Sequence, residues 1–235
     1  MKAIFKKEIN SYFNSPLGYI FIAVFVLVTA MFFSLYNLFP GVGDITYIFS
    51  NITLLLVLLI PVLTMRSFAE EKNKRTDQLL LTCPISVVSI VAGKILAAFA
   101  VFALALAVTL IYPAIISIYT DLAWVTVIGN YFGFFCMGAA FISIGVFISS
   151  LTENLLISAV GSFGALFVVY LMDWVTNTVQ NPVISAITAA ISITARFPDF
   201  AMGVINIPNV IYFISVVVIF GLLTVLQIEK RRWIK

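Results

Sequence analysis

The titratable side chains of this sequence are few, and they are concentrated in one short stretch. The chain of 235 residues has 13 Lys and Arg, 10 Asp and Glu and no His. Seven of these charges fall in "MRSFAEEKNKRTDQLLLTCP", residues 65–84, between two long apolar runs. Without His, and with Cys83 and Cys136 far apart, a metal centre, a Ser/His/Asp triad and a disulfide framework lack their residues. We therefore expect ion pairing and protein docking from this stretch, with no catalytic residue and no metal site.

The composition is that of a polytopic membrane protein. Hydrophobic residues make up 63% of the chain, charged residues only 10%, and the mean hydropathy is +1.16. No repeat or low-complexity linker divides the sequence, so residues 1–235 are expected to form a single membrane domain in contact with lipid. The net charge of +3 is too small to indicate a nucleic-acid partner.

Six apolar runs predict an all-α fold with six transmembrane helices. They cover about residues 17–39, 47–65, 95–119, 125–149, 155–172 and 209–228. The first run has no cleavage pattern and is interpreted as a retained span. Residues 1–15 place apolar and basic side chains on different faces, which predicts an interfacial amphipathic helix.

The segment 173–206 before the last run is mixed in character. Its apolar part, residues 183–195, would reach only about 20 Å as a helix, short of a hydrocarbon core of about 30 Å. A re-entrant or interfacial hairpin is therefore predicted on the outer side.

The distribution of Lys and Arg predicts the orientation. With six spans both termini lie on one side, and twelve basic residues fall on that side against one, Arg196, on the other. Because positive loops stay in the cytoplasm, we expect both termini there and the chain in the cytoplasmic membrane. The twelve are Lys2, Lys6, Lys7, Arg66, Lys72, Lys74, Arg75, Lys94, Lys230, Arg231, Arg232 and Lys235.

The spans themselves carry little recognisable machinery. Gly129 and Gly133 in "GNYFG" have a small-xxx-small spacing, which permits either close helix approach in lipid or ordinary packing within the chain. No ionisable residue lies near the middle of a span, which argues against ion-coupled carriers and proton pumps. No GxxxxGK[ST] sequence occurs either, so ATP cannot bind this chain by that route.

The charged stretch is expected to contain two short helices. Glu70 with Lys74 and Glu71 with Arg75 stand at i, i+4 in the favourable order, so the second span should extend as a solvated helix. Thr76 is a candidate N-cap for a second helix, and Asp77 suits its positive end. This second helix carries Leu79, Leu80 and Leu81 and stops at Pro84.

The three leucines need a place away from water, because burial of each leucine side chain is worth about 1.5–3 kcal/mol of stabilisation. They lie on the membrane surface, pack under the ends of the spans, or enter a groove of a separate soluble protein. Here the sequence "MRSFAEEKNKRTDQLLLTCPIS…IVAGK" resembles the first cytoplasmic loop of the type 2 ABC exporter permeases, most closely the gliding-motility-associated subgroup. "FKKEINSYFNSPLGYIF" and "FPDFAMGVINIPNVIYF…EKRRW" resemble the start and the end of the same proteins.

The resemblance implies a half-transporter with an N-terminal elbow helix (residues 1–15), a coupling loop (66–94) and re-entrant helices in the last outer loop. It implies a separate ABC ATPase subunit that binds ATP and Mg, so this chain is no enzyme and needs no cofactor. A second copy or a related permease completes the dimer, and an extracytoplasmic auxiliary subunit is compatible with the family.

By position, residues 76–82 match the family's coupling helix. The resemblance makes Leu79, Leu80 and Leu81 docking side chains and Glu70 and Glu71 their charged neighbours. Many relatives have Gly before the Thr, whereas this chain has Arg75.

Three functions follow as hypotheses. The first is the permease of an ATP-driven exporter, in which the partner ATPases push on the coupling helices. The second is a membrane anchor or force-transmitting scaffold for surface machinery, which would lack substrate-stimulated ATP hydrolysis. The third is an ion-coupled carrier, which gradient-driven uptake by this chain alone would support.

Overall fold

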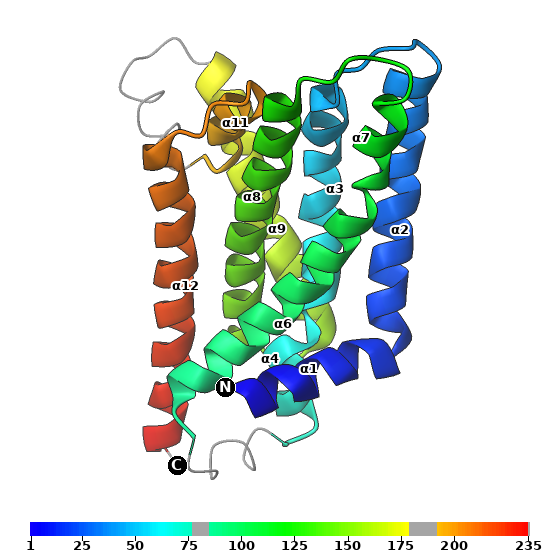
Figure 1. Ribbon diagram of the computed structural model, residues 1–235. Coiled ribbons are helices and arrows are strands. Elements are labelled where there is room, and N and C mark those ends of the chain that lie inside the picture. Colours follow the sequence, from blue (N-terminus) through cyan, green and yellow to red (C-terminus); the bar gives the residue numbers. More distant parts are fainter. Residues whose placement is uncertain (77–84, 179–191, 235) are drawn as a thin grey trace.

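The fold is a single bundle of helices. The computed structural model describes residues 1–76, 85–178 and 192–234, and every regular element in these ranges is helical. Six of these helices, or runs of consecutive helices, are long and apolar enough to cross a membrane. They run side by side, with both chain termini at the same end (Figure 1). The predicted all-α fold with six candidate transmembrane helices is confirmed.

The helices are α1 (Lys2–Asn14), α2 (Pro16–Phe33), the π-helical turn η1 (Ser34–Leu38), α3 (Thr46–Thr64), α4 (Arg66–Asn73), α6 (Val87–Val108), α7 (Ile111–Ile116), α8 (Trp124–Leu151), α9 (Leu155–Thr178), the 3-10 turn η2 (Thr194–Arg196), α11 (Phe197–Ala201) and α12 (Ile207–Ile234).

Helix α1 crosses the end of the bundle instead of joining it (Figure 1). The chain turns at Ser15, whose backbone is extended, and α2 begins at Pro16, a residue that suits the first helical position. A Cβ on Gly18 would lie 2.8 Å from the carbonyl oxygen of Tyr12, so this corner requires glycine. Its position at a membrane interface, as an elbow, stays a prediction.

Helix α4 follows α3 with only Met65 between them. Four of its eight residues are charged, so it lies beyond the apolar part of the span. The prediction of a solvated helix does not hold for one face, because that face packs against the end of α8. The buried residues on this face are Ser67, Phe68, Ala69 and Lys72.

Helix α6 begins earlier than the expected third span, so Lys94 lies inside a helix and not before it. The helix breaks one turn before Pro113, which has no N–H to donate to the carbonyl of Thr109. The hydroxyl of Tyr131 on α8 donates to that carbonyl at 2.7 Å. The break separating α6 from α7 therefore leaves the freed acceptor satisfied.

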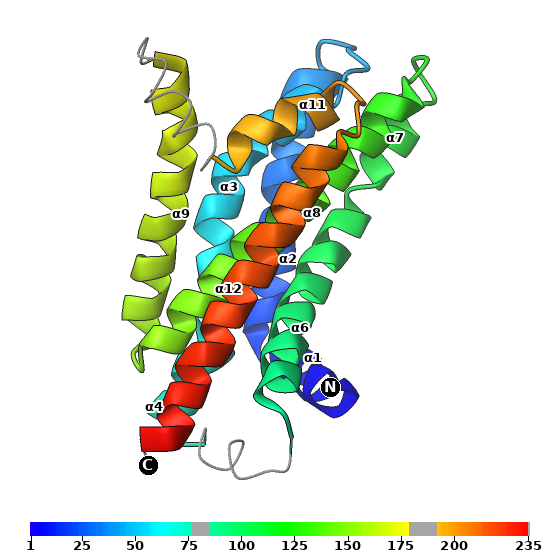
Figure 2. The ribbon, with the colours of Figure 1, turned by 90° about the vertical axis from the view of Figure 1, so that its left-hand side faces the viewer.

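Helix α8 is central and α9 is peripheral. The most apolar window of α8 is 67% buried within the chain, against 17% for α9. Figure 2 places α9 at one side of the bundle, apart from α1 and α6. Where α2, α6 and α8 meet, the rings of Phe25, Phe102 and Phe134 contact one another with centroid distances of 6.1–6.4 Å. These rings form part of the apolar core.

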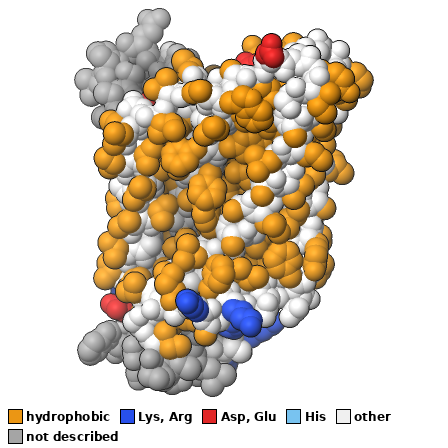
Figure 3. All heavy atoms as spheres, viewed as in Figure 1, with side chains coloured by type: hydrophobic (Ala, Val, Ile, Leu, Met, Phe, Trp, Pro, Cys, Tyr) orange, Lys and Arg blue, Asp and Glu red, His pale blue; other side chains and the backbone are white. Residues whose placement is uncertain are grey.

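The two ends of the bundle differ in charge. Figure 3 shows hydrophobic side chains over the middle of one face and Lys and Arg near its lower end. We call the end that carries the termini, α1 and α4 the basic end. The short helix α11, which directly follows Arg196 in the chain, lies at the opposite end (Figure 1). Residues 179–191, which hold most of the apolar part of the predicted re-entrant hairpin, lie outside the described residues, so that hairpin stays a prediction.

Candidate functional site

Within the charged loop, Arg75 has an unusual backbone conformation just after the end of α4. The N–H of Arg75 donates to the carbonyl of Lys72 at 3.1 Å, and that of Thr76 to the carbonyl of Glu71 at 2.9 Å. This pair of bonds is a Schellman motif, which places one residue in the left-handed region. That residue is Arg75, with φ 56°. The position therefore favours glycine, the residue that the family resemblance leads one to expect there.

Glu70 forms the ion pair that the spacing predicted and a second one. Its carboxylate accepts from Lys74 at 2.7 Å and from both Nε and Nη2 of Arg66, at 2.5 and 2.9 Å. The bonds from Arg66 and Lys74 outweigh partial burial and lower the pKa of Glu70 to about 2. All three side chains belong to α4 or its end, so this cluster stiffens the N-terminal side of the loop.

Glu71 does not pair with Arg75, and that prediction is wrong. Its Oε1 accepts from Lys7 on α1 at 2.7 Å, and its Oε2 lies 2.9 Å from Nζ of Lys94 on α6. Burial would raise the pKa of Glu71, but the positive charges of Lys94 and Lys7 lower it below its usual range. Glu71 therefore joins three helices, and its role as a charged neighbour of a docking site stays a prediction.

Lys94 is the most buried charge of this region, with 1% of its surface exposed. Its ammonium group lies 2.9 Å from Glu8, 2.9 Å from Glu71 and 2.6 Å from the carbonyl of Ser67. These three acceptors match its three N–H donors, and the ring of Phe68 lies 4.9 Å away. We call Lys7, Glu8, Glu71 and Lys94 the Lys94 network.

The same stretch is attached to α8 through Ser149, which is fully buried. The Ser149 hydroxyl accepts from the N–H groups of Phe68 and Ala69, at 3.1 and 3.2 Å, and donates to the carbonyl of Met65 at 3.0 Å. It thereby satisfies backbone groups at the start of α4, where a helix lacks intrahelical partners. The ammonium of Lys72 donates to the carbonyl of Ser150 at the C-terminal end of α8.

The remaining predicted loop residues are only partly described. The hydroxyl of Thr76 donates to the carbonyl of Glu71 at 3.3 Å, at the end of α4. Asp77, Leu79, Leu80 and Leu81 lie outside the described residues, so the second helix and its N-cap stay predictions. A cavity of about 560 Å³ lies between α1, α4 and the start of α6. Thr76 and Ile85, which flank the segment, both line it.

Gly129 and Gly133 lie at the opposite end of the molecule, against α11. A Cβ on Gly129 would lie 2.3 Å from the carbonyl oxygen of Phe200, and one on Gly133 would lie 2.6 Å from the Cβ of the same residue. Both glycines therefore make room for α11 of the same chain. This seat fixes α11 against the N-terminal half of α8.

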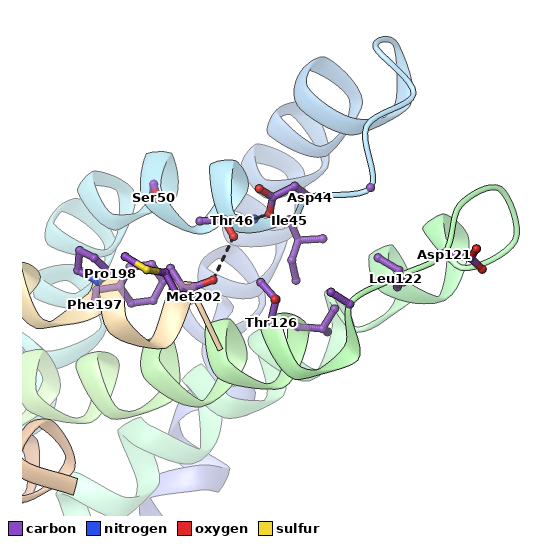
Figure 4. A pocket seen from close by; sticks show the side chains of 14 residues that line it. Asp44, Ile45, Thr46, Ser50, Asp121, Leu122, Thr126, Phe197, Pro198 and Met202 are labelled. Atoms are coloured by element: carbon purple, nitrogen blue, oxygen red, sulfur yellow. Dashed lines mark hydrogen bonds between the residues drawn. The ribbon is translucent and has the colours of Figure 1, made fainter. Parts of the chain in front are cut away.

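A second cavity, of about 610 Å³, lies beside this seat (Figure 4). The carboxylates of Asp44 and Asp121 are at its rim, and the hydroxyl of Thr46 donates to the carbonyl of Ala201 across it at 3.4 Å. Apolar side chains from α11 form one wall, and none of the described residues that line the cavity is Lys or Arg. The chain thus has a charged cavity at each end, with the bundle between them.

The chain matches the family described as "ABC-2 family transporter protein" over residues 35–226. The protein belongs to the ABC-2 transporter family. No curated protein matches the chain. As an ABC-2 permease it is a multi-pass membrane component of a transporter, a class that usually lacks its own ATPase site and pairs with an ABC ATPase subunit.

Sequence reasoning missed the two attachments of the permease loop. Neither Glu8 nor Ser149 stands out in the sequence, and Lys94 enters there only as one of the basic residues of the cytoplasmic side. The one available signal was a lysine seven residues into a helix that begins at Val87, since a charge at such a depth needs a partner. Among residues 1–76, 85–178 and 192–234 no cluster of three or more His, Cys, Asp and Glu side chains is placed to hold a metal.

Proposed function

We propose that this ABC-2 permease is the membrane subunit of an ATP-driven exporter in the cytoplasmic membrane, close to the gliding-motility-associated subgroup. A separate ABC ATPase binds ATP and Mg, docks on the loop 66–94, and drives the bundle between inward and outward access. Two permease copies, or this chain and a related one, complete the transporter.

The observation that carries this proposal is the double attachment of the loop. On its N-terminal side α4 is fastened to α8 through Ser149, and on its C-terminal side Lys94 is fastened to α1 and α4. Buried polar and charged groups are costly whenever they are unpaired or mispaired. A surface loop with no mechanical role does not need such anchors. Force applied to the loop therefore reaches the spans and is not absorbed by bending.

Helix α8 provides the route from the basic end to the opposite end. Its C-terminal end contacts α4 through Ser149, and its N-terminal half seats α11 through Gly129 and Gly133. The cavity at the opposite end is bounded by α3, α8 and α11. A tilt of α8 that begins at the loop would change the width of this cavity, which is what alternating access requires.

The charge distribution supports the orientation. Lys and Arg lie near the end that carries the termini (Figures 1 and 3), and an end rich in Lys and Arg stays in the cytoplasm, where ATP is available. In this orientation α1 lies on the cytoplasmic surface as the elbow helix, with Lys2, Lys6 and Lys7 near the lipid headgroups.

The proposal is tested by purifying the tagged chain from its native membranes. An ABC ATPase subunit should co-purify and hydrolyse ATP. The triple variant L79S/L80S/L81S, which removes the apolar side chains of the predicted coupling helix, should lose the ATPase while keeping its melting temperature. The matched control V42S replaces an apolar residue, 43% exposed, in a loop at the opposite end and should keep the ATPase.

Two results would contradict the proposal. The first is a triple variant that retains the ATPase and its hydrolysis at the wild-type level. The second is a chain that is fully active when purified with no nucleotide hydrolase attached. ATPase binding without any nucleotide-driven change in the bundle would instead favour the scaffold.

A further inference from the structure

The Lys94 network joins three elements that the sequence keeps far apart. Lys7 and Glu8 belong to α1, Glu71 to α4 and Lys94 to α6. Lys94 bonds Glu8, 86 positions before it, and Lys7 bonds Glu71, 64 positions after it. Helix α4 lies at the N-terminal side of the loop 66–94, and the start of α6 forms its C-terminal side. A single buried ammonium group thus holds both sides of the loop and the crossing helix α1.

Other contacts make α1 part of the same unit. A Cβ on Gly93, the residue before Lys94, would lie 3.0 Å from the side chain of Ile4, so α1 crosses α6 at close range. Further along α1, the hydroxyl of Tyr12 donates to the carbonyl of Leu63 at 3.1 Å, at the end of α3. Helix α1 is therefore held at two separate points along its length.

A buried charge network is a poor source of stability, because desolvation of the ions offsets most of their attraction. Hydrogen-bonded ion pairs depend on geometry, however, so a network with matched donors and acceptors fixes the relative position of the helices that carry it. The network is therefore suited to keep a fixed geometry under load.

We propose that Lys94 is a positioning residue for energy coupling, which locks α1, α4 and α6 into one rigid unit so that a push on the loop moves all three together. This inference rests on the proposed function, because it needs a partner that pushes. It adds a role for residues that lie behind the docking surface and do not touch the ATPase.

The first test uses substitutions that remove the network without leaving an unpaired ion. K94M alone leaves Glu8 without its closest cation, and it is expected to reduce yield. The triple variant E8Q/E71Q/K94M removes the buried charges together and should recover folding. K6M removes an exposed lysine from α1, outside the network, and serves as the matched control.

The readout is the reactivity of a cysteine at the opposite end. With Cys83 and Cys136 replaced by serine, D121C on the rim of the cavity is labelled with a membrane-impermeant maleimide, with and without ATP, in the complex with the ATPase. We expect ATP to change the labelling rate by a factor of about three or more in the otherwise wild-type and K6M complexes. In the triple variant ATP hydrolysis should continue while this change is lost.

The second test does not depend on any network variant. Spin labels at N10C on α1 and V88C on α6 report the separation of these helices in the wild-type network, with and without ATP. A rigid unit keeps this separation unchanged. A nucleotide-dependent change of several ångströms would overturn the inference.

The outcomes separate the two proposals. If ATP changes labelling of D121C equally in the wild type and in the folded triple variant, the role of Lys94 is refuted and the exporter proposal stands. If ATP changes labelling in neither complex, the exporter proposal fails, and the role of Lys94 fails with it.

Discussion

Replacement of Ser149 by alanine is the sharpest test of how the loop is attached. The substitution removes a hydroxyl that accepts two backbone N–H bonds and donates one, all in a site without solvent exposure. A buried backbone group left without a partner costs about 1–3 kcal/mol. Allowing for partial relaxation, S149A should destabilise the folded chain by about 2–4 kcal/mol. For a chain of this size this corresponds to a fall in melting temperature of about 4–16 °C.

The matched control is S143A on the same helix. Ser143 is equally buried, but its hydroxyl donates only to the carbonyl of Ala140, within α8 itself. Its loss should cost less than about 1 kcal/mol, because alanine has the higher helix propensity.

Melting is followed by intrinsic fluorescence of the purified protein, and hydrogen exchange is followed at individual amides. In S149A the amides of Phe68 and Ala69 should exchange faster, while amides elsewhere in α8 should change little. Equal melting temperatures for S149A and S143A, or unchanged exchange at these two amides, would refute the anchoring role of Ser149.

Three further predictions concern single positions. R75G should stabilise the chain by about 0.5–1 kcal/mol in a melting experiment, because glycine adopts the left-handed backbone without strain, whereas R75A should not. G133A should destabilise by about 1–3 kcal/mol, because its Cβ would overlap Phe200, whereas G164A in α9 meets open space and should be tolerated. The stabilising effect of Glu71, measured as the difference in melting temperature between wild type and E71Q, should be full at neutral pH. Because its folded pKa is lowered, this effect should disappear as the pH falls through that value, below 4.5; a difference that is constant with pH would contradict the ion pairs.

The predictions from sequence succeeded where the signal is local. Apolar runs of about 20 residues identify spans without any knowledge of the neighbouring helices, because the bilayer imposes the length. The i, i+4 spacing identified the pair of Glu70 and Lys74, because one helix turn brings them together. The break between α6 and α7 is also a local matter, since the missing N–H of Pro113 affects its own helix.

The same reasoning failed where the partner comes from another helix. Glu71 has the spacing for a pair with Arg75, but Arg75 takes a left-handed backbone and Glu71 meets lysines 64 positions before it and 23 positions after it. No periodicity in the sequence encodes such distances. The role of Gly133 was open for a similar reason, since small residues permit contact without specifying the contacting helix.

The sequence by itself determined that this is a membrane protein, how many candidate spans it has, and at which end its basic residues gather. These properties depend on the composition of single segments, and each segment meets the bilayer separately. Only the tertiary structure decided which charges are buried, and that Lys94 and Ser149 fasten the loop to α1, α4 and α8. Ion pairs and hydrogen bonds act over about 3 Å, so they form only after packing has brought distant segments together.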